Sequence, residues 1–207
     1  MFIQQCAEFF QNGGIFMYPL LACSILLVAA IIYRAIGSRS SAVMPQKLYE
    51  ALQEYALTGD NKSRAISLAN SSSSVLGRLA TSILTSTSHN EEELKANCLS
   101  KAKHEFVIQQ AGLPIMDMIV MIAPMFGILG TASGLVLVFS QFGINDEQGM
   151  IAEGIARALN MTITGLAIAT PAVIAQTYFS RKLEHYSSSM EVLLTELIHR
   201  HLKSSNQ

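Results

Sequence analysis

Charged residues are scarce in this sequence, and three long stretches contain none. Of the 207 residues, 14% are charged and 50% are hydrophobic. The charge-free stretches run from Phe9 to Tyr33, from Met118 to Asn145 and from Ala158 to Ser180. At about 1.5 Å of helical rise per residue, each can cross a hydrocarbon core about 30 Å thick. This composition excludes an ordinary soluble domain and predicts an all-α integral membrane protein with three transmembrane helices.

Side chains for catalysis, metal binding or nucleic-acid binding do not form a recognisable motif. Of the three cysteines, Cys6 is expected on the outer side of the bilayer, Cys23 within it and Cys98 in the cytoplasm. No pair has metal-ligand spacing. His199 and His201 would lie about 200° apart around a helix, which does not suit a shared metal. The net charge of −1 provides no basic footprint for nucleic acid. We therefore expect no enzyme, no metal, no cofactor and no nucleic-acid partner.

The basic residues are placed asymmetrically and predict the orientation in the bilayer. Thirteen of the 14 Lys and Arg lie between Arg34 and Lys103 or from Arg181 onward, and only Arg157 lies elsewhere. The positive-inside rule therefore places the N-terminus outside, and the long loop and the C-terminal tail in the cytoplasm. Because residues 1–14 lack the basic residues of a signal peptide, we expect the first span to be retained as an anchor.

These observations divide the chain into seven segments, and the loop between the first two spans reads as largely helical. A helix is predicted to begin at Pro45, and another to run from the cap residue Asn90 to Gly112. The segments are an outer amphipathic lead-in (1–14), the first span (15–36), a cytoplasmic helical domain (37–114), the second span (115–142), an outer connector (143–157), the third span (158–180) and a cytoplasmic helical tail (181–207).

Small residues share a face with one threonine in each of the last two spans. Relative to Thr131, Gly127 lies about 40° and Gly134 about 60° around the helix, and Gly130 completes a G-xxx-G pair. In the third span, Gly165, Ala169 and Gln176 fall within about 60° of Thr162. The pattern predicts close helix packing around two hydroxyl groups, which a generic packed membrane helix would also show.

The runs from Met118 to Asn145 and from Ala158 to Ser180 contain no Asp, Glu, Lys, Arg or His, and Asp117 lies at the cytoplasmic edge of the second span. A proton pathway normally needs an ionisable group within the bilayer. If this chain serves such a pathway, we expect another subunit to bring the acid.

Two motifs in these spans resemble a known family. The run from Ala123 to Gly134, Ala-Pro-Met-Phe-Gly-Ile-Leu-Gly-Thr-Ala-Ser-Gly, resembles the second-span signature of the MotA/TolQ/ExbB proton-channel family. The run from Ala158 to Ala172 is similar to the third-span signature, with Ala-Leu, Thr, Gly-Leu and Pro-Ala at matching positions. Three spans, an outer N-terminus and a large first loop also resemble the ExbB/TolQ branch.

The resemblance implies a homo-oligomeric ring, a pentamer, in the bacterial inner membrane. The ring would surround an ExbD/TolR-like single-span partner whose transmembrane Asp carries protons, and a TonB-like protein would transmit the work. Thr131 and Thr162 would line the pore. Residues expected to pack the pore spans are Gly127, Gly130, Gly134, Gly165, Pro124 and Pro171. Pore-mouth candidates are Glu153, Arg157 and Gln176.

Two positions depart from the family pattern, and three functions stay open. Arg157 stands where the family commonly has Glu, and Gln176-Thr177 replaces a frequent Tyr-Asn. The leading hypothesis is an ExbB-like subunit that energises TonB-dependent outer-membrane transport. The alternatives are a TolQ-like or other envelope-machine stator, and a non-conducting membrane scaffold. The sequence does not separate H⁺ from Na⁺ as the ion.

Overall fold

The computed structural model describes residues 14–37, 43–86, 90–140 and 148–205, and every regular element in these ranges is a helix. The chain divides into two compact units. One is Met1–Ile32 with Gly112–Tyr178, and the other is Tyr33–Ala111 with Phe179–Gln207. Most of the predicted amphipathic lead-in, residues 1–13, and residues 143–147 of the predicted connector lie outside the described residues.

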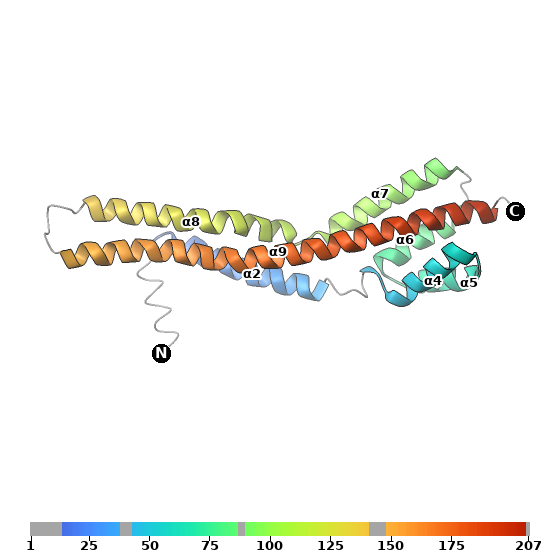
Figure 1. Cartoon of the computed structure of the whole chain (residues 1–207), viewed down its shortest axis with the longest axis horizontal. Coiled ribbons are helices and arrows are strands. Elements are labelled where there is room, and N and C mark those ends of the chain that lie inside the picture. Colours follow the sequence, from blue (N-terminus) through green and yellow to red (C-terminus); the bar gives the residue numbers. More distant parts are fainter. Residues whose placement is uncertain (1–13, 38–42, 87–89, 141–147, 206–207) are drawn as a thin grey trace. The chain divides into compact units, whose positions relative to one another are not determined.

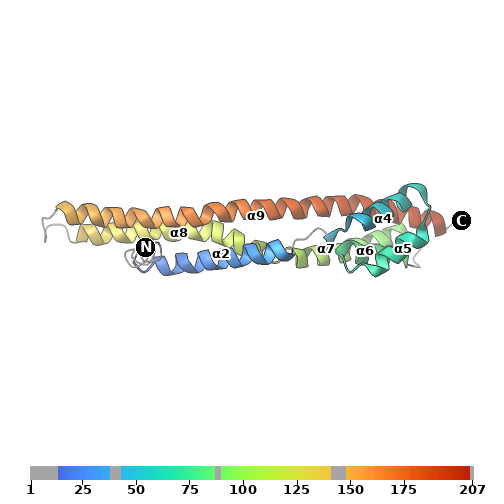
Figure 2. The ribbon, with the colours of Figure 1, turned by 90° about the horizontal axis from the view of Figure 1, so that it is seen from below.

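The first unit, called the membrane unit below, contains the apolar helices. Helices α2 (Met17–Gly37), α8 (Leu113–Ser140) and α9 (Gln148–Ser205) are each long and apolar enough to cross a membrane. Within this unit α8 and the first part of α9 run side by side in opposite directions, with α2 beside them (Figure 1; Figure 2).

Large apolar side chains remain exposed along these helices, for example Ile128 at 62% and Val136 at 69%. Such extended apolar faces suit contact with lipid or with other subunits.

Helix α9 is longer than the predicted third span at both ends. It begins at Gln148, so residues 148–157, which the sequence placed in the connector, are already helical. It also continues through Pro171 without a break. Pro171 removes one backbone donor, and a membrane helix tolerates this where neighbouring groups satisfy the freed carbonyl.

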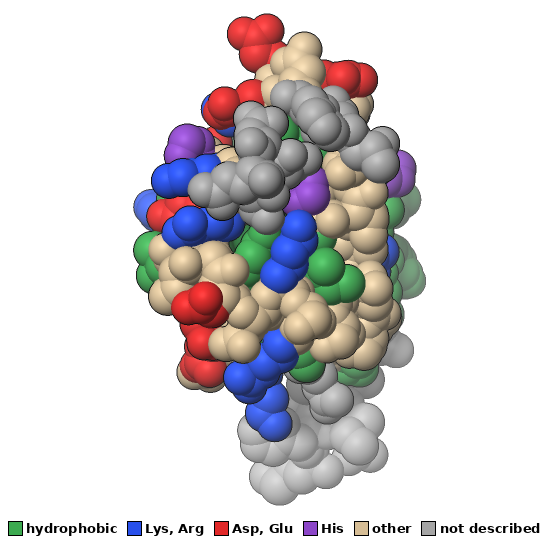
Figure 3. Space-filling view, turned by 90° about the vertical axis from the view of Figure 1, so that its right-hand side faces the viewer, with side chains coloured by type: hydrophobic (Ala, Val, Ile, Leu, Met, Phe, Trp, Pro, Cys, Tyr) green, Lys and Arg blue, Asp and Glu red, His purple; other side chains and the backbone are tan. Residues whose placement is uncertain are grey.

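The second unit, called the cytoplasmic unit after its predicted location, is a helical domain with its own core. It contains α4 (Gln46–Thr58), α5 (Lys62–Ser71), α6 (Val75–Leu84), α7 (Glu91–Gln109) and the last part of α9. Its core includes Leu52, Leu76, Ile83 and Leu197, each with no exposed surface. Lys, Arg, Asp and Glu side chains are interspersed over the face of this unit seen in Figure 3. An apolar interior and a mixed-charge surface are the pattern of an ordinary water-exposed domain.

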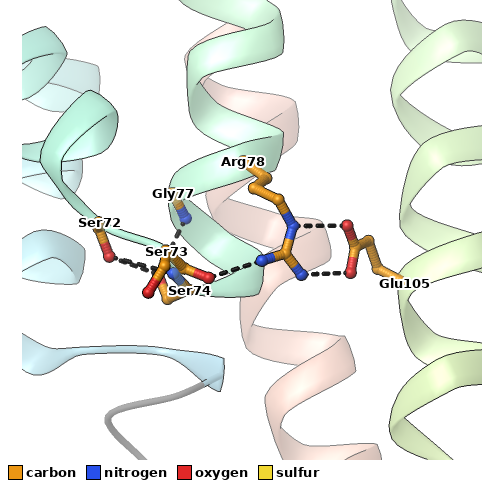
Figure 4. A network of polar contacts seen from close by, with 6 residues as sticks. All are labelled: Ser72, Ser73, Ser74, Gly77, Arg78 and Glu105. Atoms are coloured by element: carbon orange, nitrogen blue, oxygen red, sulfur yellow. Dashed lines mark hydrogen bonds and ion pairs between the residues drawn. The ribbon is translucent and has the colours of Figure 1, made fainter.

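A polar network joins α6 to α7 in this unit (Figure 4). Arg78 donates to both carboxylate oxygens of Glu105, at 2.7 Å and 2.5 Å, and to the carbonyl of Ser73 at 2.6 Å. Ser74 caps α6 by accepting a hydrogen bond from the backbone of Gly77 at 3.1 Å. A Cβ at Gly77 would lie 2.6 Å from the carbonyl oxygen of Ser72, so only glycine fits this turn.

Contacts of two arginines, one buried and one half-buried, close the C-terminal ends of helices in the same unit. Arg200 donates to the carbonyl of Ala56 at 2.9 Å and contacts that of Leu57, near the end of α4. Arg34 is 5% exposed, donates to the carbonyl of Gln109 and lies 5.9 Å from the centre of the Phe179 ring. Because the last carbonyls of a helix lack helical donors, both arginines satisfy groups that would otherwise be unpaired.

Helix α7 ends at Gln109, one turn before the predicted Gly112. Gly112 has a φ of 89°, a left-handed conformation that ends the helical path before α8 begins at Leu113.

Candidate functional site

The two threonines singled out in the sequence meet between α8 and α9. The hydroxyl of Thr131 lies 3.0 Å from the carbonyl of Gly127 and 3.2 Å from that of Ala158. The hydroxyl of Thr162 lies 3.2 Å from the same Gly127 carbonyl, and the two hydroxyls contact each other. Both side chains are half-buried. The pair therefore forms one small polar site in the membrane unit.

The two hydroxyl groups have fewer hydrogen-bond donors than close oxygen contacts. Each hydroxyl supplies one donor and two acceptor lone pairs. Two hydroxyl protons cannot make all four contacts of Thr131 and Thr162 at once. The hydroxyls can therefore exchange partners, accept a hydrogen bond from an incoming acid or water, and donate one to a carboxylate.

Next to this pair, glycines allow the backbones of α8 and α9 to approach each other closely. A Cβ at Gly165 would lie 2.6 Å from the carbonyl oxygen of Ala123 and 3.1 Å from the Cα of Gly127. A Cβ at Gly127 would lie 3.1 Å from the Cα of Thr162. This is the close approach that small residues permit in membrane helices, and it places the two hydroxyls within reach of each other.

The next two glycines along α8 face small or flexible parts of α9. A Cβ at Gly130 would lie 2.1 Å from the sulfur of Met161, and one at Gly134 would lie 2.8 Å from the Cβ of Ala158. The glycine stripe of α8 therefore lies along α9 on both sides of the threonine pair.

The two prolines and Gln176 lie away from the hydroxyl pair. Pro124 is half-buried inside α8, and Pro171 is exposed inside α9. Gln176 is half-buried, and its Oε1 accepts a hydrogen bond from Thr177 at 3.3 Å. Proline leaves the carbonyl four residues earlier without its helical donor, so each helix carries one extra acceptor, at Val120 in α8 and at Ala167 in α9.

The remaining candidates, Glu153 and Arg157, form an ion pair of 2.6 Å on the outward surface of α9. They line a cavity of about 490 Å³ together with Gly130, Gly134 and the residues that precede α2, Gly14 to Phe16. The structure thus brings these four sequence candidates into one cavity, one turn from the threonine pair.

Several groups at this site were not predicted from the sequence. The Ala158 carbonyl, which contacts Thr131, is a backbone atom, and no side-chain pattern could point to it. The cavity also includes Ser133, Gly154 and Val138. The G-x-x-G spacing of Gly127 and Gly130 could have pointed to Met161, since a long side chain opposite two glycines fills the space they leave.

No described group of three or more His, Cys, Asp or Glu side chains is arranged to hold a metal ion. Between residues 118 and 140 and between residues 158 and 180 the described chain also carries no ionisable side chain apart from the phenol of Tyr178. The chemistry available in these two described stretches is therefore hydrogen bonding by hydroxyl and backbone groups.

Comparison with known proteins agrees with this arrangement. Residues 68–192 match the model of the MotA/TolQ/ExbB proton channel family. The chain is 26% identical to ExbB-like protein 1 of Synechocystis over 170 residues, which cover 80% of this chain and 66% of that protein. It is 28% identical to biopolymer transport protein exbB1 of Vibrio cholerae, over 84% of this chain and 82% of that protein.

A third relative, biopolymer transport protein ExbB of Helicobacter pylori, is 33% identical over 40% of this chain and 59% of that protein. The chain thus spans about two thirds of the length of the Synechocystis relative. The family match covers well over half of the chain and includes both threonine-bearing helices. The chain therefore belongs to the MotA/TolQ/ExbB proton channel family, a family of membrane transport proteins with a stator-like role rather than a family of enzymes.

Proposed function

We propose that this chain is the ring-forming subunit of a motor in the bacterial inner membrane, driven by the proton motive force. Five copies would surround the single-span helices of an ExbD/TolR-like partner, with the N-terminus periplasmic and the C-terminus cytoplasmic. A TonB-like protein would carry the work to outer-membrane transport. The observation that carries this proposal is the Thr131–Thr162 hydroxyl pair in a stretch of membrane helix that has no acid of its own.

The hydroxyl pair suits a titrating carboxyl group that arrives on another helix. When that carboxyl is protonated, its O–H can donate to a free lone pair of Thr131 or Thr162. When it is ionised, a hydroxyl can turn from the Gly127 carbonyl, 3.0–3.2 Å away, and donate to the carboxylate. Both protonation states of the partner's Asp thus find a hydrogen-bond partner in an otherwise apolar region.

The remaining candidates mark the ends of the proposed pathway. Gln176 lies toward the predicted cytoplasmic end, and Glu153 and Arg157 lie toward the predicted periplasmic end. Each proton that crosses releases about 2.3 kcal/mol per 100 mV of membrane potential. Several protons are therefore needed for substantial mechanical work.

The names of the relatives support biopolymer transport as the task. The Vibrio cholerae and Helicobacter pylori proteins are both called biopolymer transport proteins. A TolQ-like role would use the same membrane helices, and a deletion strain separates the two. Loss of iron uptake indicates the ExbB-like role, and sensitivity to detergent indicates the TolQ-like role.

Replacing either threonine by valine should strongly slow proton flux while the complex still assembles. Thr131→Val and Thr162→Val remove a hydroxyl and keep the shape of the side chain. Loss of one hydrogen bond to a charged group, about 2 kcal/mol, corresponds to a roughly 30-fold slower flux. The complex co-purified with its partner is placed in vesicles, and proton entry is followed with a pH-sensitive dye under an imposed membrane potential.

Thr164→Val is the matched control, because the Thr164 hydroxyl donates within its own helix, to the carbonyl of Asn160 at 2.8 Å. Its complex should conduct like the wild type. The proposal is wrong if the chain conducts protons without any partner, or if the Thr131 and Thr162 variants conduct as well as the control. A co-purified partner that lacks an acid within its span would also contradict it.

A further inference from the structure

The cavity of the membrane unit has an apolar interior and a charged rim. Its volume is about 490 Å³, within the range of about 300–1,000 Å³ typical of small-molecule sites. Glycines 130, 134 and 154 leave its floor without side chains, and Phe16, Leu137 and Met161 are among the apolar residues around it. Such an interior suits a hydrocarbon chain better than water, because buried water needs several polar partners.

The rim of the cavity carries one cation and one anion side by side. Arg157 and Glu153 are joined at 2.6 Å, and their side chains remain 50% and 63% exposed. Arg157 directly precedes the charge-free run that begins at Ala158. The rim therefore lies where the hydrocarbon core gives way to the polar headgroups of a bilayer.

We propose that this cavity binds one phospholipid with a phosphoethanolamine headgroup. The lipid phosphate would bind the guanidinium of Arg157, the primary ammonium would bind the carboxylate of Glu153, and an acyl chain would enter the cavity. This occupant follows from charge complementarity, since a headgroup with adjacent positive and negative charges matches an exposed pair of opposite charges.

Replacing the Glu153–Arg157 ion pair by contacts with the lipid headgroup should cost little free energy. An exposed ion pair within one helix contributes little to stability, whereas an Arg–phosphate contact is charge-assisted and can be bidentate. The lipid site goes beyond the proposed proton pathway: it uses Glu153 and Arg157, which lie at the proposed outer end of that pathway, but neither Thr131 nor Thr162 lines the cavity.

Lipid retention by the full-length protein tests this proposal. The protein is purified in mild detergent, mixed with phosphatidylethanolamine, phosphatidylcholine or phosphatidylglycerol, and examined by native mass spectrometry. The wild type should retain one phosphatidylethanolamine per chain, roughly tenfold more strongly than phosphatidylcholine, whose quaternary ammonium cannot donate a hydrogen bond.

The two rim residues should change lipid selectivity in different directions. Arg157→Gln should weaken the binding of all three lipids, because each carries a phosphate. Glu153→Gln should weaken the binding of phosphatidylethanolamine and strengthen that of phosphatidylglycerol, because it removes the negative charge that pairs with the ammonium and frees Arg157. Equal losses in both variants would indicate a purely structural ion pair and would overturn the proposal.

A cavity-filling pair of variants tests the acyl site. Ser133→Phe places a ring in the cavity and should abolish lipid retention, whereas Ala132→Phe, on the preceding residue of α8 and outside the cavity, should not. If Ser133→Phe dissociates an oligomer and leaves lipid binding unchanged, a second copy of the chain occupies the cavity and the lipid proposal fails. Proton flux is measured separately on the Ser133→Phe and Ala132→Phe proteins. Loss of lipid from Ser133→Phe with intact proton flux supports the lipid site alone.

Discussion

At the residue scale, the contact that matters most for the membrane unit involves no side chain. Gly165 of α9 and Gly127 of α8 meet through backbone atoms, and a Cβ at Gly165 would lie 2.6 Å from the Ala123 carbonyl oxygen. Because a carbonyl oxygen in a helix cannot rotate away, an added methyl group must push the helices apart. The Thr131–Thr162 contact depends on this spacing.

Gly165→Ala should therefore destabilise the protein, although alanine is the better helix former. Overpacking of a tight contact loses about 1–3 kcal/mol, which outweighs the gain in helix propensity of up to about 1 kcal/mol. Thermal unfolding of the purified chain in detergent measures the change.

Gly37→Ala is the matched control, because a Cβ at Gly37 would meet nothing within 4 Å. We expect this variant to unfold at the wild-type temperature or slightly above it. Equal unfolding temperatures for the two variants would show that the Gly127–Gly165 contact does not limit the approach of the helices.

Much of this residue-scale arrangement could be predicted from spacing alone. A helix turns by about 100° per residue, so the order of Gly127, Thr131 and Gly134 already implied one shared stripe. The Ala158 carbonyl and the Glu153–Arg157 cavity could not be predicted in this way. The first is a backbone atom, and the second forms only when the residues before α2 come beside α8 and α9.

At the scale of elements, the cytoplasmic unit relies on an ion pair between α6 and α7. The bidentate contact with Arg78 lowers the pKa of the Glu105 carboxyl, mainly through its hydrogen bonds. The Glu105 side chain is 16% exposed, whereas that of Arg78 is 49% exposed. Solvent therefore screens the pair, and we expect it to contribute about 1 kcal/mol.

Acid should weaken the junction of α6 and α7. Because the folded pKa of Glu105 is lowered, its contribution is fully present above the ordinary Glu value of about 4.3 and is lost as the pH falls through the lower folded value. Hydrogen exchange of α6 amides, compared between the wild type and Glu105→Gln, measures this contribution. The difference should be clear at pH 6 and should vanish in acid, once the pH has fallen below the lowered folded pKa of Glu105.

Glu92→Gln on the same helix is the control, since Glu92 is exposed near the start of α7. It should leave α6 exchange unchanged at every pH. A Glu105→Gln difference that persists undiminished in acid would contradict an electrostatic origin.

Element boundaries were harder to predict than element identity. Hydropathy marks where a helix meets lipid, and it does not mark where the helix begins. The residues 148–157 were therefore placed in a connector, although Glu153 and Arg157 are spaced one helical turn apart and are compatible with the start of α9. The early end of α7 follows from the left-handed backbone of Gly112, a conformation that glycine permits and does not require.

At the scale of the whole molecule, the distribution of charge predicts which ends of the helices face the cytoplasm. Twelve of the 14 basic residues lie in the two segments assigned to that side, and Arg34 lies at the cytoplasmic end of the first span. The protein also carries one cysteine in each predicted compartment, Cys6 outside, Cys23 in the first span and Cys98 in the cytoplasmic unit. Cysteine labelling can therefore report the orientation.

A chain that keeps only Cys6 should react with a membrane-impermeant maleimide on intact spheroplasts. A cysteine-free chain with Lys103→Cys, an exposed position on α7, should react only after lysis. Cys98 should react slowly even after lysis, because it is 5% exposed and burial raises the pKa of its thiol. Labelling of Lys103→Cys from outside would reverse the predicted orientation.

The backbone contact at Gly127 and Gly165 also has a mechanical consequence. Two helices that touch through side chains can slide past each other by changing rotamers, whereas two that touch through main-chain atoms have no torsion angles available to absorb such a shift. The contacting parts of α8 and α9 should therefore tilt or rotate together as one rigid body. Any conformational change during work must then be accommodated at the other surfaces of these helices, where flexible methionine, leucine and isoleucine side chains remain exposed.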